Sequence, residues 1–394
     1  MIGENNQIKI NSWLLPFSWV FGLVVKLRNH LFDTGVLKQH SFTIPIISVG
    51  NVTVGGTGKT PHVEYLIRLL ENKVKVAVLS RGYKRKSEGY VLADKDTTMA
   101  EIGDEPFQMK QKFPGIYVAV DAKRVEGINR LTSDKGTKDV DVILLDDAYQ
   151  HRYVKPGINI LLIDYHRLLT NDALLPAGRL REPKSATRRA DMVIVTKCPN
   201  NLKPVDFRVL TKSLSLLAYQ ELYFTTLEYG DLMPLFRPQE EQRTLRSIHK
   251  NEHVLLLTGI ASPKLIHQEV KKHSHNIEQL TFADHHSFTD KDVENINLTF
   301  EQMATPKIII TTEKDAARLL NLNGLSPEVK ESLYSLPITV KFMLEQEKHF
   351  NSKILSYVEK NSKNSILAKG KDDHKPKENQ QSDSGIRTIS FKSN

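Results

Sequence analysis

The stretch Ile44-Pro-Ile-Ile-Ser-Val-Gly-Asn-Val-Thr-Val-Gly-Gly-Thr-Gly-Lys-Thr-Pro61 decides how this chain folds. The β-branched run at 44–49 predicts a buried strand, the glycines predict a turn, and the apolar spacing from Lys59 onward predicts a helix. A strand, a glycine-rich turn and a helix in this order form the context in which a phosphate-binding loop is a specific prediction.

The glycines of this loop can adopt backbone angles that are closed to other residues, so that successive N–H groups converge on one anion. The start of the following helix adds its partial positive charge. Lys59 would contact the outer phosphates of a nucleoside triphosphate, and the Thr60 hydroxyl would ligate Mg²⁺. The usual pattern has a glycine five residues before Gly58, where this chain has Thr53. The predicted nucleotide-binding residues are Asn51, Thr53, Val54, Gly55, Gly56, Thr57, Gly58, Lys59 and Thr60.

The apolar content and the fraction of charged residues are ordinary for a soluble globular protein. The 394 residues are enough for two α/β domains, each with its own core. The net charge of +9 suggests an anionic partner, which could be a membrane, a nucleic acid or a phosphorylated substrate. The single cysteine, Cys198, excludes a disulfide framework and indicates a reducing compartment.

Residues 11–38 form the most apolar part of the chain and contain both tryptophans, Trp13 and Trp19. The uncharged run ends at Lys26, which makes it too short to span a bilayer. Two interpretations stay open for the helix predicted here. Its aromatic face and its basic flank are typical of a helix that lies in a membrane interface. The same apolar spacing would also suit a helix packed on the protein's own core.

Polar side chains follow two further predicted strands. The strand at 140–145 ends in Asp146-Asp147, where phosphate-loop enzymes place the carboxylates that hold Mg²⁺. The strand at 74–80 is followed by Arg81-Gly-Tyr83, which should face the phosphates or an anionic substrate. Gly103-Asp104-Glu105-Pro106 reads as an acidic helix start, and this local role by itself explains why its residues are acidic.

The absence of one aspartate predicts which nucleotide base the protein binds. GTPases read guanine with an aspartate two residues after a lysine such as Lys197, and this chain has Pro199 there. ATP is therefore favoured over GTP.

The expected fold is a P-loop-containing α/β/α sandwich with a second, smaller α/β domain. Residues 1–38 are expected to form the membrane-interface helix as part of the first domain, and 39–220 the phosphate-loop kinase domain. A second α/β domain is expected over 221–359. The composition past Glu359 predicts a disordered basic tail, 360–394.

Taken together, these motifs resemble those of one family, the bacterial tetraacyldisaccharide 4′-kinases of lipid A biosynthesis. The resemblance covers residues 10 to about 350 and follows the family's order of motifs. Besides the phosphate loop, it is carried by Ser80–Tyr83, Gly103–Pro106, Leu145–His151, Gly178–Pro183, Phe282–His286 and Thr312–Asp315.

The resemblance implies a reaction and a location. ATP would phosphorylate the 4′-hydroxyl of a tetraacyldisaccharide 1-phosphate to give lipid IVA, a precursor of lipopolysaccharide. The enzyme would be peripheral, at the cytoplasmic face of the inner membrane, with no nucleic acid and no obligate protein partner.

The resemblance also implies roles for single residues. Asp104 would act on the attacking hydroxyl, supported by a histidine of the second domain, His285, although the neighbouring His286 leaves that choice open. The Mg²⁺ ligands would be Thr60, Asp146, Asp147 and Glu182. The other positions that match the family's site are Arg81, Tyr83, Arg124, Gln150 and Arg181.

The alternative from another class is a membrane-associated P-loop switch or ATPase that controls a protein partner. The phosphate loop and Asp146 fit it equally well, but it has no need of Asp104 and His285. Hydrolysis raised only by a protein partner, without transfer to lipid, would favour the switch. A nucleic-acid-binding ATPase rests on net charge alone, because the chain lacks base-stacking aromatic residues in a basic strand or loop.

Overall fold

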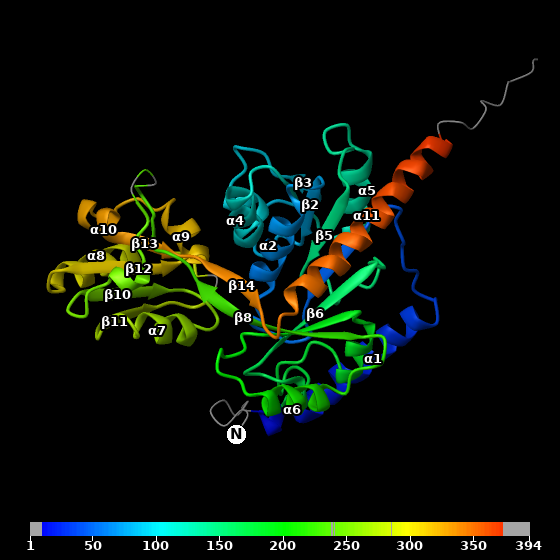
Figure 1. Ribbon diagram of the computed structural model, residues 1–394, viewed down its shortest axis with the longest axis horizontal. Helices are drawn as coiled ribbons and strands as arrows, with labels where there is room; N and C mark the ends of the chain where they lie inside the picture. Colours follow the sequence, from blue (N-terminus) through cyan, green and yellow to red (C-terminus); the bar gives the residue numbers. More distant parts are fainter. Residues whose placement is uncertain (1–9, 238, 240, 285, 373–394) are drawn as a thin grey trace, which may run out of the picture.

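The computed structural model describes residues 10–237, 239, 241–284 and 286–372. The chain forms two α/β units that lie side by side, each built on its own sheet (Figure 1). The expected α/β class, with a phosphate loop in the larger unit and a smaller second unit, is confirmed.

The larger unit is built on a nine-stranded sheet in the order β14-β8-β7-β6-β1-β5-β2-β4-β3. The strands from β8 to β4 run parallel, while β14 and β3 pair antiparallel at the two edges. Strand β1, which carries the phosphate loop, lies in the middle, between β6 and β5. The strands are β1 (Ile46–Gly50), β2 (Val76–Ser80), β3 (Val91–Leu92), β4 (Tyr117–Val120), β5 (Val142–Asp146), β6 (Ile158–Asp164), β7 (Met192–Thr196), β8 (Glu221–Tyr229) and β14 (Ile338–Phe342).

Helices cover both faces of this sheet, which makes it a three-layer sandwich. Strand β1 is buried on both sides: Ile47 packs against the first helical layer and Ile46 against the second. The first layer contains α2 (Lys59–Leu70), α3 (Met99–Ile102), α4 (Asp104–Lys112) and α11 (Glu347–Asp372). The second contains α5 (Arg124–Ser133), α6 (Pro204–Leu214) and the short 3₁₀ helices η2 (Leu169–Asn171) and η3 (Lys184–Arg189).

The smaller unit is built on a five-stranded sheet in the order β11-β10-β12-β13-β9, in which only β9 runs antiparallel to its neighbour. Its strands are β9 (Met233–Pro234), β10 (His253–Thr258), β11 (Asn276–Thr281), β12 (Lys307–Thr312) and β13 (Leu333–Leu336). Its helices are η4 (Leu245–Ser247), α7 (Lys264–Val270), α8 (Asp290–Gln302), α9 (Glu313–Leu319) and α10 (Pro327–Ser332).

The division of the chain differs from the one expected at residue 221. Strand β8 pairs with β7 in the larger sheet and leads into β9 of the smaller one, and the chain returns from β13 into β14 beside β8. Where the two crossings meet, Gly230 N donates to Pro337 O at 3.0 Å. Helix α11 then packs on the larger unit, because Phe350 contacts the rings of Tyr223 and Phe342. It continues to Asp372, so residues 360–372 are helical rather than disordered. The rest of the expected tail, 373–394, lies outside the described residues.

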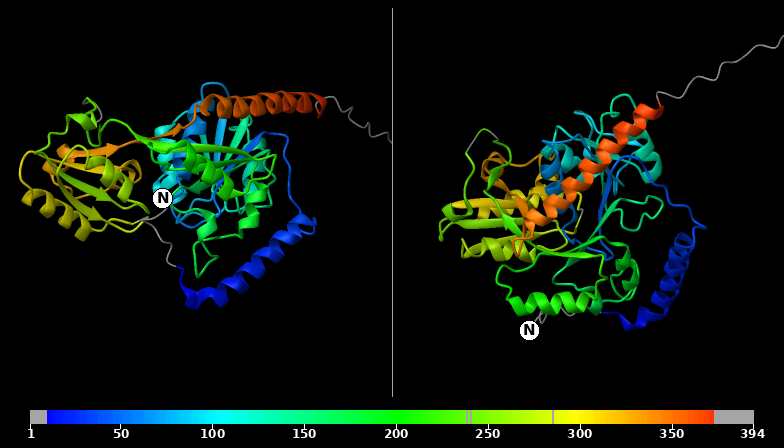
Figure 2. Two further views of the ribbon diagram at one scale, coloured as in Figure 1. Left: turned by 60° about the horizontal axis from the view of Figure 1, so that its bottom comes forward. Right: turned by 45° about the vertical axis from the view of Figure 1, so that its right-hand side comes forward.

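The N-terminal segment forms η1 (Ser12–Leu14) and α1 (Leu15–Asp33), which lies along the outer edge of the larger unit (Figure 2, dark blue). One side of α1 is fixed, since Ser18 Oγ donates to Leu174 O at 2.9 Å. The other side leaves Trp19 and Leu23 exposed over 77% and 69% of their surfaces, and Trp13 of the adjoining η1 is exposed over 89%. The interpretation as a packed helix therefore holds for one side of α1, and the membrane-interface interpretation stays a prediction for its uncovered side. Across the described residues, no helix combines the length and apolarity needed to cross a membrane.

Candidate active site

The phosphate loop follows the predicted order, with β1 ending at Gly50 and α2 starting at Lys59. Gly55 and Gly58 have φ of 109° and 87°, the left-handed region that other residues rarely adopt. Asn51 Nδ2 donates to Thr57 Oγ1 at 2.8 Å across the loop. The side chains of Asn51 and Thr57 thus brace the loop from within.

Neighbouring segments fix the loop from outside. Val54 N donates to Arg179 O, and Arg181 N donates to Val52 O, both at 2.8 Å. Gln150 Nε2 donates to Asn51 O at 2.6 Å, and its Oε1 lies 3.5 Å from Arg181 Nη1. The predicted site residues Gln150 and Arg181 therefore lie against the phosphate loop.

Lys197 also holds the loop, which the sequence did not predict. Its backbone is left-handed, with φ of 58°, and its Nζ donates to Gly56 O and, at 2.8 Å, to Asp164 Oδ2. Burial would raise the pKa of Asp164, but the hydrogen bonds from His166 and Lys197 hold it below its usual range. The lysine found at the guanine-reading position thus makes an ion pair that supports the loop.

Asp146 and Asp147 end β5 in contrasting environments. Asp146 is fully buried, its Oδ2 accepts from Ser80 Oγ at 3.2 Å, and its Oδ1 has no hydrogen-bond partner. Burial, followed by the charges of Glu105 and Asp147, raises the pKa of Asp146 to about 7. Asp147 lies 3.6 Å from Lys59 Nζ and 3.3 Å from Arg181 Nη1. Burial opposes ionisation of Asp147 too, but these cations lower its pKa.

The donor set fits a divalent cation that is shared with a phosphate group. Within the described ranges, no three His, Cys, Asp or Glu side chains form a ready-made metal site. Mg²⁺ does not need one, because it is usually bound by one or two carboxylates together with substrate phosphates and water. The unpartnered oxygen of Asp146, with Glu105 nearby, provides such carboxylates.

Glu182, which the family resemblance placed at the metal, is buried beside two arginines. One carboxylate oxygen pairs with Arg189, while the other, Oε1, lies 3.9 Å from Arg28 Nη1 and has no hydrogen-bond partner. Its role at the metal stays a prediction.

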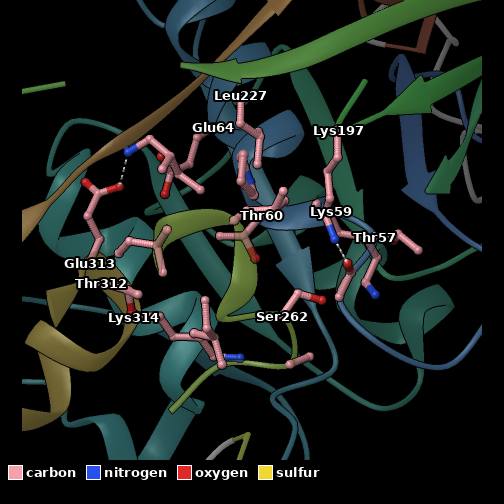
Figure 3. Close-up of a pocket in the computed structure, with 18 of the residues that line it drawn as sticks. Thr57, Lys59, Thr60, Glu64, Lys197, Leu227, Ser262, Thr312, Glu313 and Lys314 are labelled. Atoms are coloured by element: carbon pink, nitrogen blue, oxygen red, sulfur yellow. Dashed lines mark hydrogen bonds between the residues drawn. The ribbon is translucent and has the colours of Figure 1, made fainter. Parts of the chain in front are cut away.

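A cavity of about 200 Å³ lies between the phosphate loop and the smaller unit (Figure 3). The larger unit lines it with residues 56–61, Glu64 and Lys197, and the smaller unit with Ser262, Glu313 and Lys314. Part of its wall is apolar and consists of Leu227, Tyr229, Ile260, Leu265, Ile266 and Ile338.

Asp104 lies at the start of α4 and faces the smaller unit. The Arg318 guanidinium donates to Asp104 Oδ2, while Oδ1 accepts from Glu105 N at 3.1 Å. Asp104 lines a second cavity, of about 690 Å³, together with Tyr83 and His286. The start of helix α4 borders both cavities, because Glu105 lines the first and Asp104 the second.

His285 and His286 are the two candidates for the histidine that supports Asp104. His285 lies outside the described residues. His286 Nε2 is 2.9 Å from Asp292 Oδ2, and its ring is stacked on Phe282 with centroids 5.0 Å apart.

Arg124 and Arg81, two further predicted site residues, place positive charge near Asp146. Burial lowers the pKa of Arg124 to about 10, and the nearby charges of Asp146 and Arg81 also act on it. Arg124 Nη1 donates to Asp121 O at 2.8 Å, but its buried Nε has no partner. The sequence alone did not identify Glu105, Lys197, Lys314 or Arg318. Glu105 was explained by its helix start, and Lys314 stood only within the Thr312–Asp315 motif.

Comparisons with known proteins agree on one family. The model of the tetraacyldisaccharide-1-P 4′-kinase family matches residues 10–359. A tetraacyldisaccharide 4′-kinase from Phocaeicola vulgatus is 56% identical over 363 residues, covering 92% of this chain and 99% of the relative. One from Bacteroides fragilis is 50% identical over 375 residues, covering 94% and 100%. A crystal structure of the "apo" form of LpxK from Aquifex aeolicus in complex with ATP is 29% identical, with a TM-score of 0.67, and the match covers 88% of this chain and 99% of that one.

Proposed function

The chain belongs to the tetraacyldisaccharide-1-P 4′-kinase family, and from this premise we propose that it transfers the γ-phosphoryl group of ATP to the 4′-hydroxyl of a tetraacyldisaccharide 1-phosphate, giving lipid IVA. The observation that carries this function is the family match over residues 10–359, which includes the phosphate loop, Asp104 and the Asp146-Asp147 pair. The alternative, a nucleotide switch, has no support among the relatives, which are named as kinases.

ATP fits the cavity between the two units. Its phosphates would lie on the N–H groups of residues 55–60 and at the start of α2, with Lys59 on the outer phosphates. The apolar side chains of Leu227, Ile260 and Ile338 provide a wall against which an adenine ring can be buried.

Mg²⁺ would be held by the Thr60 hydroxyl and by Asp146 and Asp147, to which the structure leads us to add Glu105. Bound there, the ion would offset negative charge on the transferring phosphoryl group. Glu182 stays the remaining predicted ligand, because its buried Oε1 has no hydrogen-bond partner.

Asp104 would accept the proton of the 4′-hydroxyl. As the hydroxyl oxygen bonds to the γ-phosphorus, its proton passes to the carboxylate and the bond between the γ-phosphorus and the oxygen of ADP breaks. His285 stays the predicted support of Asp104, since His286 is already paired with Asp292. Gln150, Arg181, Arg124, Arg81 and Tyr83 would line the acceptor side of the site.

The exposed face of α1 would lie in the membrane interface at the cytoplasmic face of the inner membrane, as a peripheral attachment. Trp13, Trp19 and Leu23 provide the apolar contact, and the acyl chains of the substrate would stay in the lipid. The same helix touches the site, because Arg28 Nη2 donates to Gln150 O at 2.6 Å. A headgroup held at the membrane surface would therefore arrive next to the phosphate loop.

Transfer of label from γ-labelled ATP to a tetraacylated disaccharide 1-phosphate in detergent micelles tests this function. We expect labelled lipid with the wild type. We also expect losses of several orders of magnitude with Asp104→Asn and with Lys59→Met, since the first lacks the proton acceptor and the second the phosphate ligand. The kinase assignment would be wrong if the wild type hydrolyses ATP without labelling lipid. Labelled lipid at the wild-type rate with Asp104→Asn would keep the kinase and remove Asp104 as the proton acceptor.

A further inference from the structure

The smaller unit supplies a lysine to the cavity beside the phosphate loop. We propose that Lys314 binds the triphosphate of ATP, so that both units hold the nucleotide. This inference rests on the proposed ATP-dependent function and adds a phosphate ligand that lies outside the loop.

The position of Lys314 is set by the start of α9. Thr312 Oγ1 accepts from Asp315 N at 3.1 Å, which caps the helix two residues before Lys314. The lysine side chain is only 19% exposed and lines the same cavity as Lys59 and Thr60 (Figure 3). Its ammonium group lies beside Asp284 and Glu105, which line the same cavity, so ATP bound there would lie near it.

The charge balance of this cavity requires a second cation. Among the described residues that line it, the lysines are Lys59, Lys197 and Lys314, and there is no arginine. Lys197 is already bound to Asp164 and to the carbonyl of Gly56, a role that a phosphate could not take over without releasing the loop. Besides Mg²⁺ and the loop N–H groups, the cationic side chains of this cavity that a triphosphate could contact are therefore Lys59 and Lys314.

The present partners of Lys314 can be exchanged. Its Nζ lies 3.2 Å from Asp284 Oδ1 and 3.5 Å from Glu105 Oε1, and the second distance exceeds that of a good hydrogen bond. These carboxylates compensate the ammonium charge in the nucleotide-free cavity. Phosphate oxygens would replace them, and Glu105 would be released beside Asp146, whose charge it already affects.

The exchange would tie the smaller unit to the nucleotide. Lys314 belongs to α9, which packs on α4 of the larger unit, and α4 carries both Glu105 and Asp104. ATP bound to Lys59 and Lys314 together would therefore hold α9 against the phosphate loop.

Dissociation constants of ATP and of AMP, measured by calorimetry without lipid, test the inference. We expect Lys314→Met to weaken ATP about 10- to 100-fold, the effect of losing one charge-assisted contact. The affinity for AMP, which lacks the outer phosphates, should stay unchanged. Lys314→Arg keeps the charge and should restore most of the ATP affinity. The matched control is Lys272→Met, which removes an exposed lysine of the same unit that pairs with Glu269 at 2.6 Å, and it should bind ATP like the wild type.

Two results would overturn the inference. One is an unchanged affinity of Lys314→Met for ATP. The other is an equal loss for ATP and AMP, because it would mean that Lys314 only holds the two units together. These results can be told apart from a failure of the kinase assignment. In that case the wild-type protein would bind ATP but transfer no label to the lipid.

Discussion

Arg318 of the smaller unit donates a hydrogen bond to Asp104 of the larger one, and both side chains are nearly buried. The same guanidinium donates to Asp315 Oδ1 at 3.0 Å, and Asp315 Oδ2 accepts from Gly259 N at 2.8 Å. The proposed proton acceptor is therefore oriented from across the gap between the units. Its geometry depends on how the smaller unit sits against α4.

Replacing Arg318 should impair transfer without affecting ATP affinity. Arg318→Met removes one of the contacts that orient the Asp104 carboxylate, and a displacement of about 1 Å can cost about 100-fold in rate. Steady-state kinetics should show a lower kcat, while calorimetry shows an unchanged dissociation constant for ATP. Arg318→Lys keeps a cation beside Asp315 but cannot bind Asp104 and Asp315 with two arms of one guanidinium. A low kcat in this variant would therefore come from a misplaced Asp104 carboxylate and not from an uncompensated charge on Asp315. A kcat within twofold of the wild type for Arg318→Met would show that Asp104 needs no such support.

The buried Asp146 carboxylate should lower the free energy of unfolding of the protein. Burial raises the pKa of Asp146 from the ordinary 3.8 of an aspartate to about 7, so ionisation is opposed in the folded state and stability falls as pH rises from about 4 to 7. Asp146→Asn should raise the free energy of unfolding by a few kcal/mol at pH 8 without Mg²⁺, and it should abolish lipid labelling. Urea unfolding of both proteins at pH 4 and pH 8 measures the difference. Equal stability at pH 8 would mean that the carboxylate is well solvated.

His62 makes stability depend on pH in the opposite direction. Gly58 O can only accept, so Nδ1 carries the proton and donates to it at 2.7 Å, and Nε2 accepts from Thr225 Oγ1 at 3.1 Å. Burial lowers the pKa of His62 from 6.5 to about 4. Its contribution is therefore complete above pH 6.5 and is lost as the pH falls toward 4, by about 3 kcal/mol in all.

Urea unfolding between pH 8 and pH 4.5 checks this dependence. His62→Gln should show a smaller loss of stability on acidification than the wild type. Burial also lowers the pKa of His151 to about 4. The variant His151→Gln therefore measures how much this second histidine contributes to the loss of stability on acidification. The assignment to His62 would be wrong if the slopes of wild type and His62→Gln coincide.

Local patterns in the sequence located the phosphate loop but not what surrounds it. The β1 strand, the turn and the α2 helix were predictable because they are neighbours in the chain, and Asp146 because it ends an apolar run. The return of β14 beside β8 and the packing of α11 depend on contacts more than 100 residues apart, such as Gln346 with Leu222. Lys197 reaches Gly56 and Arg318 reaches Asp104 through such contacts, so no spacing rule could identify these two roles.

The exposed face of α1 should bind lipid by its apolar side chains. Trp13→Ser, Trp19→Ser and Leu23→Ser together remove three large side chains, each worth about 1.5–3 kcal/mol when fully buried in lipid. Co-sedimentation with anionic phospholipid vesicles should therefore show binding weakened by about 100-fold or more, while the affinity for ATP in solution stays the same.

The matched control is Leu298→Ser with Leu320→Ser, exposed leucines of the smaller unit, which should sediment like the wild type. If the control loses as much lipid binding as the triple variant, the contact is not specific to α1. If the triple variant still sediments fully, the membrane is held by another surface.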